Sequence, residues 1–237
     1  MFIAKILKML KYILSLSLFV FCFTARAQNE EKELTKEEKK LENKGNPGIA
    51  IGIDLAPFVT HLFSEERFGV EANARYTVNL KWQGVAEIGY ENVEIDDEKM
   101  TYSSNGSFIR LGGDYNLFKI DEVGNNDNIL LGLRYGLAIQ DHECPRYTIN
   151  EGYWGDYVGA LGSSTVGSHW VEFVFGLRSE VLTNFYMGWS VRVKKIINVG
   201  TDSVLEPYSI PGYGRRDNST NLGFTYTLEY QIPFKKK

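Results

Sequence analysis

The feature that most constrains the fold of this chain is an alternation of apolar and polar residues from Ile49 almost to the C-terminus. Successive side chains of a β-strand point to opposite faces, so a period of two predicts strands with one apolar and one polar face. Eight strands are enough to close a barrel. The alternating segments are residues 49–55, 68–80, 82–91, 109–117, 129–140, 171–180, 185–194 and 221–234.

The composition agrees with strands and excludes several classes of protein. Aromatic residues make up 14% of the 237 residues, and there are 23 glycines but only 6 prolines, which suits many strands and turns. A formal net charge of −4 excludes a strongly basic nucleic-acid binder, so we expect no nucleic-acid partner. Two cysteines are too few for a disulfide framework or a cysteine-built metal site.

The N-terminus has the pattern of a secretory signal peptide. Lys5, Lys8 and Lys11 are followed by an apolar run over residues 12–23 and by the small-residue pattern Ala-Arg-Ala at 25–27. The apolar run is short for a membrane-spanning helix, which needs about 20 residues. Because the segment carries four basic residues and no acid, its removal changes the net charge from −4 to −8.

A charged segment follows the signal peptide. Eleven of the fifteen residues 30–44 are charged, and Leu34 and Leu41 are the apolar ones, so this stretch cannot build a core. We therefore predict a signal peptide over residues 1–27, a solvated periplasmic tether over 28–47 and a β-barrel over 48–237.

Alternation alone leaves open which face of the barrel points inward. A periplasmic lipocalin-like carrier of an apolar ligand would have its apolar face inside, whereas a membrane barrel would have it outside. Three features favour a transmembrane barrel. The first is that arginines on the polar face have glycine neighbours, as with Arg134 between Gly132 and Gly136, which suits a narrow lumen.

The second feature is that the charges of the polar face nearly cancel, as enclosed charges must, because an unpaired buried ion costs several kcal/mol. We predict a network of lumenal charges in a lumen plugged by side chains. Its predicted members are Glu71, Arg75, Glu87, Arg110, Asp114, Arg134, Glu172, Arg178, Glu180, Arg192 and Glu229.

The third feature is the last segment, where Tyr226, Leu228, Tyr230, Ile232 and Phe234 form an apolar and aromatic stripe. This stripe looks like the C-terminal signal read by the outer-membrane insertion machinery. We therefore predict an eight-stranded antiparallel up-and-down transmembrane barrel, in contact with outer-membrane lipid, with both termini in the periplasm.

Several short stretches carry a family resemblance. Residues 86–90, 113–116, 132–136, 169–172 and 210–212 resemble a small Bacteroidetes family of outer-membrane β-barrel proteins, over about Gly48 to Phe234. More loosely, the chain is similar to eight-stranded barrels of the OmpA and OmpX type. The resemblance implies a fold and a location but no activity and no catalytic residues.

The candidates for chemistry are few. His142 lies beside Asp141 and Glu143, with Ser163 and Ser164 further on, but triads are recognised by geometry that sequence does not fix. The same acids, His142 and Cys144 form the one cluster of metal-ligand types, and adjacent residues of an extended chain point in opposite directions. We therefore predict no catalysis, cofactor or metal. A small pore or a membrane-embedded lipid-modifying enzyme remains a second alternative to the carrier.

Residues 141–168 are expected to form the longest loop. Tyr147, Tyr153, Trp154 and Tyr157 lie there among glycines, and such aromatic residues are frequent in binding loops. The loop either caps the barrel mouth or contacts an extracellular partner, and residues 208–216 could join it. The function predicted from the sequence is a structural or surface-interaction role in the outer membrane.

Overall fold

The structure is a computed structural model that describes residues 48–64, 66–78, 81–118, 127–151, 155–200 and 206–234. The predicted signal peptide and tether lie outside the described residues, as do Tyr153 and Trp154. All described elements belong to one compact unit, Glu42–Lys237. In this part of the chain, no helix has both the length and the apolar character that crossing a membrane requires.

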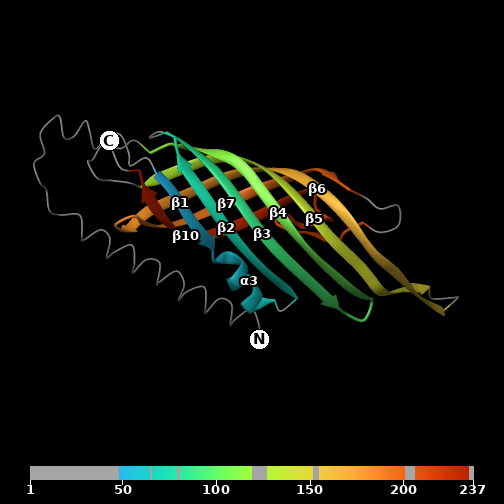
Figure 1. Ribbon diagram of the computed structural model, residues 1–237. Coiled ribbons are helices and arrows are strands. Elements are labelled where there is room, and N and C mark those ends of the chain that lie inside the picture. The colour runs from blue at the N-terminus through green and yellow to red at the C-terminus, as the bar shows by residue number, and fades with distance from the viewer. Residues whose placement is uncertain are drawn as a thin grey trace, which may run out of the picture. The chain divides into compact units, whose positions relative to one another are not determined.

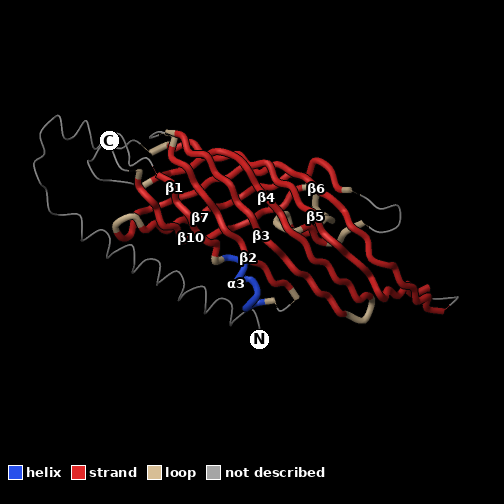
Figure 2. The backbone as a smooth tube through the Cα atoms, viewed as in Figure 1, coloured by secondary structure: helices blue, strands red, loops and turns tan. Residues whose placement is uncertain are grey.

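Eight strands form a closed antiparallel barrel (Figures 1 and 2). Each strand pairs with its neighbours along the chain, and the first strand pairs with the last, so the topology is up-and-down. The all-β, eight-stranded antiparallel barrel predicted from the alternation is thereby confirmed. The strands are β1 (Gly48–Asp54), β2 (Arg67–Thr77), β3 (Trp82–Asp96), β4 (Met100–Asn116), β5 (Asn128–Glu151), β6 (Gly155–Leu182), β7 (Phe185–Val199) and β10 (Thr220–Pro233).

The apolar face of the barrel points outward and the polar face points inward. Neighbouring residues of β5 show this division, since Leu133 is 64% exposed and Arg134 is 3% exposed. The same alternation is present in β1, where Ile49, Ile51 and Ile53 are exposed. The barrel interior is thus built mainly from polar and charged side chains.

β5 and β6 continue well beyond the other strands as a two-stranded hairpin (Figure 1). Their pairing runs as far as Glu151 and Gly155, past the last residue of β4 that pairs with β5, Met100. The prediction of a long loop over residues 141–168 is therefore wrong. Among the side chains that the structure describes, none from 145 to 165 is buried, so no burial imposes there an apolar alternation that would mark a strand.

β1 is the shortest strand of the barrel and is followed by helix α3 (Ala56–Phe63). The helix contacts β2 and β10, the two strands on either side of β1. Pro57 stands in the first turn of the helix, a position where its missing N–H leaves no intrahelical bond unmade.

The connection between β7 and β10 folds back toward the barrel. It contains two short paired strands, β8 (Ser209–Ile210) and β9 (Gly214–Arg215). Ile210 and Tyr213 are buried in an apolar cluster with side chains of four barrel strands: Phe108, Ala138, Trp170 and Val199. We call residues 206–219 the plug.

Candidate functional site

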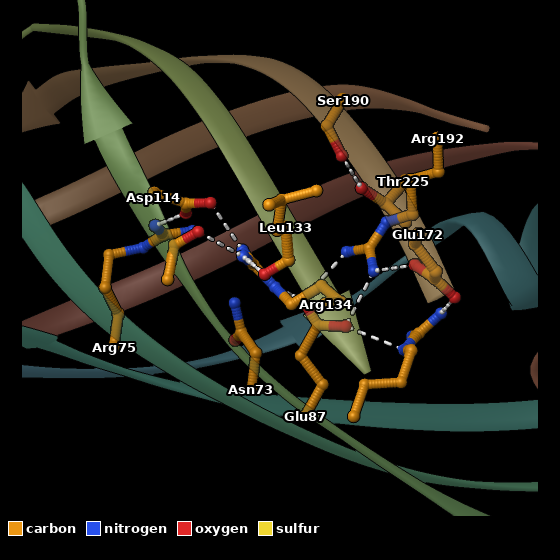
Figure 3. Close-up of polar contacts among 12 residues, drawn as sticks. Asn73, Arg75, Glu87, Asp114, Leu133, Arg134, Glu172, Ser190, Arg192 and Thr225 are labelled. Carbon is orange, nitrogen blue, oxygen red and sulfur yellow. Dashed lines mark hydrogen bonds and ion pairs between the residues drawn. The ribbon is translucent and has the colours of Figure 1, made fainter. Parts of the chain in front are cut away.

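The barrel interior contains a continuous network of ion pairs, shown in part in Figure 3. Arg110 of β4 contacts three acids from three strands: Glu71 of β2, Glu87 of β3 at 2.7 Å and Glu172 of β6 at 3.4 Å. Arg192 of β7 reaches the last two of these, at 2.6 Å and 3.1 Å. Arg110 and Arg192 thus connect their own strands, β4 and β7, to the acids of β2, β3 and β6.

The network continues toward β10 through a second group. Arg134 of β5 contacts Asp114 of β4 at 2.7 Å and is 3.5 Å from Glu87, so it joins the two groups. Arg75 of β2 pairs with Asp114 and lies 3.6 Å from Glu229 of β10. Arg178 of β6 completes the chain of contacts at 2.6 Å from Glu229.

The charges of this network balance. Among the described residues, the connected ion pairs join five arginines to five acids, and every one of these side chains is at most 9% exposed. Neutral groups satisfy further lone pairs: Asn73 donates to Glu229 at 2.7 Å, and the Trp170 indole donates to Glu172 at 2.7 Å. Removing one partner of such a buried pair costs about 3–5 kcal/mol because a buried charge is left uncompensated.

Ten of the eleven residues predicted as lumenal charges are in this connected set. The exception is Glu180, which lies near the β6–β7 turn and accepts a hydrogen bond from the backbone N–H of Asn184 at 2.6 Å. Two inward-facing charges outside the predicted set, Glu91 and Lys194, contact the plug instead.

Glycines make room for the large interior side chains. A Cβ at Gly132 would lie 2.9 Å from the Arg134 guanidinium, and one at Gly112 would lie 2.8 Å from Cδ of the same side chain. The glycine on its other side, Gly136, faces the Trp170 ring rather than Arg134. Glycine beside arginine therefore serves the packing of a narrow interior, as the sequence indicated.

The plug is held by polar contacts to inward-facing strand residues. The Ser209 carbonyl accepts a hydrogen bond from Gln140 at 2.8 Å, and its hydroxyl accepts one from Arg67 at 2.6 Å. Gly212 donates its N–H to Glu91 at 3.2 Å, and its carbonyl accepts from Lys194 at 2.6 Å. Both sides of the plug are thus bonded to the barrel wall.

The close packing of the plug depends on Gly212. This residue has a φ of 74°, a left-handed conformation that favours glycine, and a Cβ there would lie 2.7 Å from the Phe108 ring. Burial raises the pKa of the neighbouring Tyr213 hydroxyl above its ordinary value. The sequence left open whether residues 141–168, joined by residues 208–216, cap the barrel or contact a partner. In the structure it is the plug, which includes residues 208–216, that packs into the barrel through Ile210 and Tyr213.

Two of the four aromatic residues predicted for surface contact are described, and both lie on the β5–β6 hairpin. Tyr147 and Tyr157 pack together on the β5–β6 hairpin, with ring centroids 6.2 Å apart. Tyr157, Ile149 and Val158 are exposed there. The other two predicted contact residues, Tyr153 and Trp154, lie outside the described residues.

The residues considered as catalytic or metal-binding candidates lie on opposite faces of the β5–β6 hairpin. His142 is buried and lies opposite Ser164 in the strand register, whereas Asp141 is exposed and accepts a hydrogen bond from Thr165. Cys144 is buried on the same side as His142. Among the residues that the structure describes, no group of three or more His, Cys, Asp or Glu side chains could hold a metal ion.

Comparison with known proteins gives a family and a structural likeness. A family model described as "Domain of unknown function (DUF6048)" matches residues 9–237. No curated protein matches the chain. Among solved structures, the barrel is similar to Ail, the attachment invasion locus protein of Yersinia pestis, with 9% sequence identity and a TM-score of 0.40 over 79% of this chain and 98% of that one.

Proposed function

Since the chain belongs to the family described as Domain of unknown function (DUF6048), whose description assigns no activity, we propose a function from the geometry of the barrel. The protein is an integral outer-membrane β-barrel with an interior filled by its own side chains, and its role is structural or one of surface interaction. A Bacteroidetes origin, a likeness to OmpA and OmpX, and periplasmic termini remain predictions.

The observation that carries this proposal is the inverted distribution of apolar and charged side chains. Balanced ion pairs fill the interior, while large apolar side chains cover the outside of every strand of the barrel. In water such an exterior would be an aggregation surface far larger than monomeric soluble proteins expose. This argues against a lipocalin-like carrier, whose apolar face would line the interior.

The length of the apolar exterior supports a membrane span. On β5, outward residues from Ile129 to Ile139 are all apolar or aromatic, a stretch of eleven residues. A tilted strand of about 9–11 residues crosses the hydrocarbon core of a bilayer. Asp141 and Glu143, which follow on the same face, end the apolar stretch.

Aromatic pairs on the exterior support an interfacial belt. Trp82 and Tyr115 pack edge to face with ring centroids 5.0 Å apart, and Tyr76 packs on Phe234 at 6.1 Å. All four lie at the end of the barrel where β1 begins and β10 ends. Aromatic girdles at both interfaces are typical of outer-membrane barrels.

The filled interior supports a role other than conduction. An eight-stranded barrel is just wide enough for side chains to fill it, and here the ion pairs and the plug occupy the interior. The exposed β5–β6 hairpin, with Tyr147 and Tyr157, is the surface that suits contact with an extracellular partner.

The experiment that tests this proposal combines membrane extraction with conductance. We expect the full-length protein to stay in the outer-membrane fraction after carbonate washing and to migrate faster on gels before heating than after. A protein released by carbonate would be a soluble carrier. Reconstituted protein should give no stable conductance, and open pores of nanosiemens size would contradict the filled interior.

A further inference from the structure

The apolar exterior of the barrel ends at directly opposite residues on two neighbouring strands. On β7 the outward residues up to Val193 are apolar or aromatic, and the next outward residue is Lys195. On β10 the outward residues as far as Leu222 are apolar or aromatic, and the next one is Thr220. Lys195 and Thr220 are partners in the register of the two strands, so the edge of the apolar surface passes through this pair.

In the proposed membrane barrel, Lys195 lies where the headgroups of the bilayer begin. The apolar run on β7 covers residues 185–193, and a tilted strand of about 9–11 residues crosses the hydrocarbon core. The next outward residue therefore lies at the boundary of that core. A lysine in this position extends its ammonium group toward the headgroups, because a charge in hydrocarbon is costly.

The Lys195 ammonium is held beside two hydroxyl groups. It donates to Oγ of Ser219 at 3.1 Å and to Oγ1 of Thr220 at 3.4 Å. The backbone fixes this arrangement, because the N–H of Ile196 donates to the Ser219 carbonyl at 3.3 Å. The side chains of Lys195, Ser219 and Thr220 are all exposed. Together they form a group of hydrogen-bonding side chains that is open to the outside of the barrel.

The charge of Lys195 is not compensated by an acid. Within the described part of the chain, no ion pair includes this residue. The preceding lysine, Lys194, points inward and donates to the Gly212 carbonyl of the plug. On β5, in contrast, the apolar run ends at the acid Asp141. An anion at the edge of the apolar surface is therefore attracted to β7 and repelled by β5.

We propose that Lys195, Ser219 and Thr220 bind the phosphate group of a membrane lipid. The ammonium offers three donors, and each hydroxyl can turn its proton toward a phosphate oxygen. Phosphate oxygens are strong acceptors and carry the negative charge that compensates the lysine. The phosphate comes from a lipid because the exposed apolar side chains next to the site, Val193 and Leu222, would contact the acyl chains of the same molecule. This inference rests on the proposed membrane location.

The test is the affinity of the purified full-length protein for phosphatidic acid in detergent micelles, measured by native mass spectrometry. Phosphatidylcholine is the reference lipid, because its choline group places a positive charge beside the phosphate. Lys195→Gln removes the charge of the site, and Lys195→Arg keeps it. The matched control is Lys99→Gln, which removes an exposed lysine from the turn between β3 and β4.

We expect Lys195→Gln to weaken the binding of phosphatidic acid about fivefold, the effect of one lysine at an anionic surface. Ser219→Ala combined with Thr220→Val should also weaken it, whereas the Lys195→Arg and Lys99→Gln proteins should bind as the unmodified protein does. The binding of phosphatidylcholine should change little in every variant. Equal affinities of the Lys195→Gln and Lys99→Gln proteins for phosphatidic acid would overturn the proposal.

Competition with inorganic phosphate identifies the source of the phosphate group. At millimolar concentration it should leave phosphatidic acid bound, because the acyl chains add contacts with the apolar exterior. Displacement of phosphatidic acid by inorganic phosphate, in a manner that depends on Lys195, would show that the site takes free phosphate and would overturn the assignment to a lipid.

The outcome is separable from that of the proposed function. Heat-dependent gel mobility shows whether each variant has folded, and only folded protein is scored. Release of the protein from membranes by carbonate contradicts the membrane barrel itself. A protein that stays in the membrane but binds phosphatidic acid equally well without the Lys195 charge contradicts the lipid site alone.

Discussion

Arg192 of β7 and Glu87 of β3 lie 105 positions apart in the sequence and form a two-point ion pair inside the barrel. The Nη1–Oε2 distance is 2.6 Å and the Nη2–Oε1 distance is 2.9 Å. Because β3 and β7 are not neighbours in the sheet, this pair spans the interior. Such bidentate contacts between arginine and a carboxylate are among the strongest polar interactions in proteins.

Replacing Arg192 by Leu removes one of the positive charges that compensate the buried carboxylates of Glu87 and Glu172. We expect the free energy of unfolding to fall by about 3–5 kcal/mol, the cost of a broken buried pair. The measurement is the urea midpoint in detergent micelles. The control is Arg146→Leu, which removes an exposed arginine 3.6 Å from Asp96 and should change stability by less than about 1 kcal/mol. Similar effects of the two substitutions would show that Arg192 is not enclosed.

Replacing Gly132 by Ala should disturb the network through packing alone. The added methyl group would press on Asp114 and lie 2.9 Å from the Arg134 guanidinium. Overpacking of this kind typically costs about 1–3 kcal/mol. Gly84→Ala is the matched control on the outward face of β3, since a Cβ there meets nothing within 4 Å. A neutral Gly132→Ala variant would contradict the close packing of the interior.

Replacing Ile210 by Ala should loosen the plug without unfolding the barrel. Loss of a buried isoleucine costs about 2–5 kcal/mol, so local opening should rise at least tenfold. The measurement is the rate of trypsin cleavage after Arg215 and Arg216 in the folded barrel. Asp217→Asn, an exposed change in the same segment, should leave the rate unchanged. A fast cleavage rate in the unmodified protein would show that the plug is not held.

The orientation of the barrel wall predicts how its tryptophans respond to brominated lipid. Trp82 and Trp189 face outward and are exposed, whereas Trp170 faces inward and is 0% exposed. In variants that keep a single tryptophan, the fluorescence of the first two should be strongly quenched in bilayers of bromolipid. That of Trp170 should be little affected. Quenching of Trp170 alone would mean that the apolar face lies inside.

Shortening the β5–β6 hairpin should leave the barrel intact. Residues 147–159 pair almost entirely within the hairpin, so replacing residues 145–160 by Asn-Gly removes little of the contact with β4. We expect unchanged heat-dependent gel mobility and an unchanged unfolding midpoint. A variant that fails to insert would show that the hairpin is part of the folding core.

The barrel could be predicted from sequence because burial acts on every second residue. In the segment with Leu133 and Arg134, opposite environments on the two faces impose the alternation, and balanced charge indicated which face is enclosed. No such signal marks residues 155–165, which have no interior to face. Pro57 indicates that β1 ends near this residue, because proline has no N–H to donate to a neighbouring strand. That Pro57 would lie opposite Phe224 follows only from the register of β1 and β10, which the sequence does not give. The plug depends on tertiary packing of Ile210 and Tyr213, which local patterns do not encode.

The distribution of the ion pairs among the strands has a consequence for how the wall assembles. Arg75 of β2 needs Asp114 of β4 and Glu229 of β10, and Arg192 of β7 needs Glu87 of β3. Arg110, Arg134 and Arg192 each have an acid on an adjacent strand. The ion pairs of Arg75, Arg178, Glu71 and Glu229, in contrast, all join strands that are not neighbours along the chain or in the sheet. A hairpin that entered the bilayer alone would carry uncompensated charges into hydrocarbon. We therefore expect concerted assembly, in which the strands come together before the barrel inserts into the membrane.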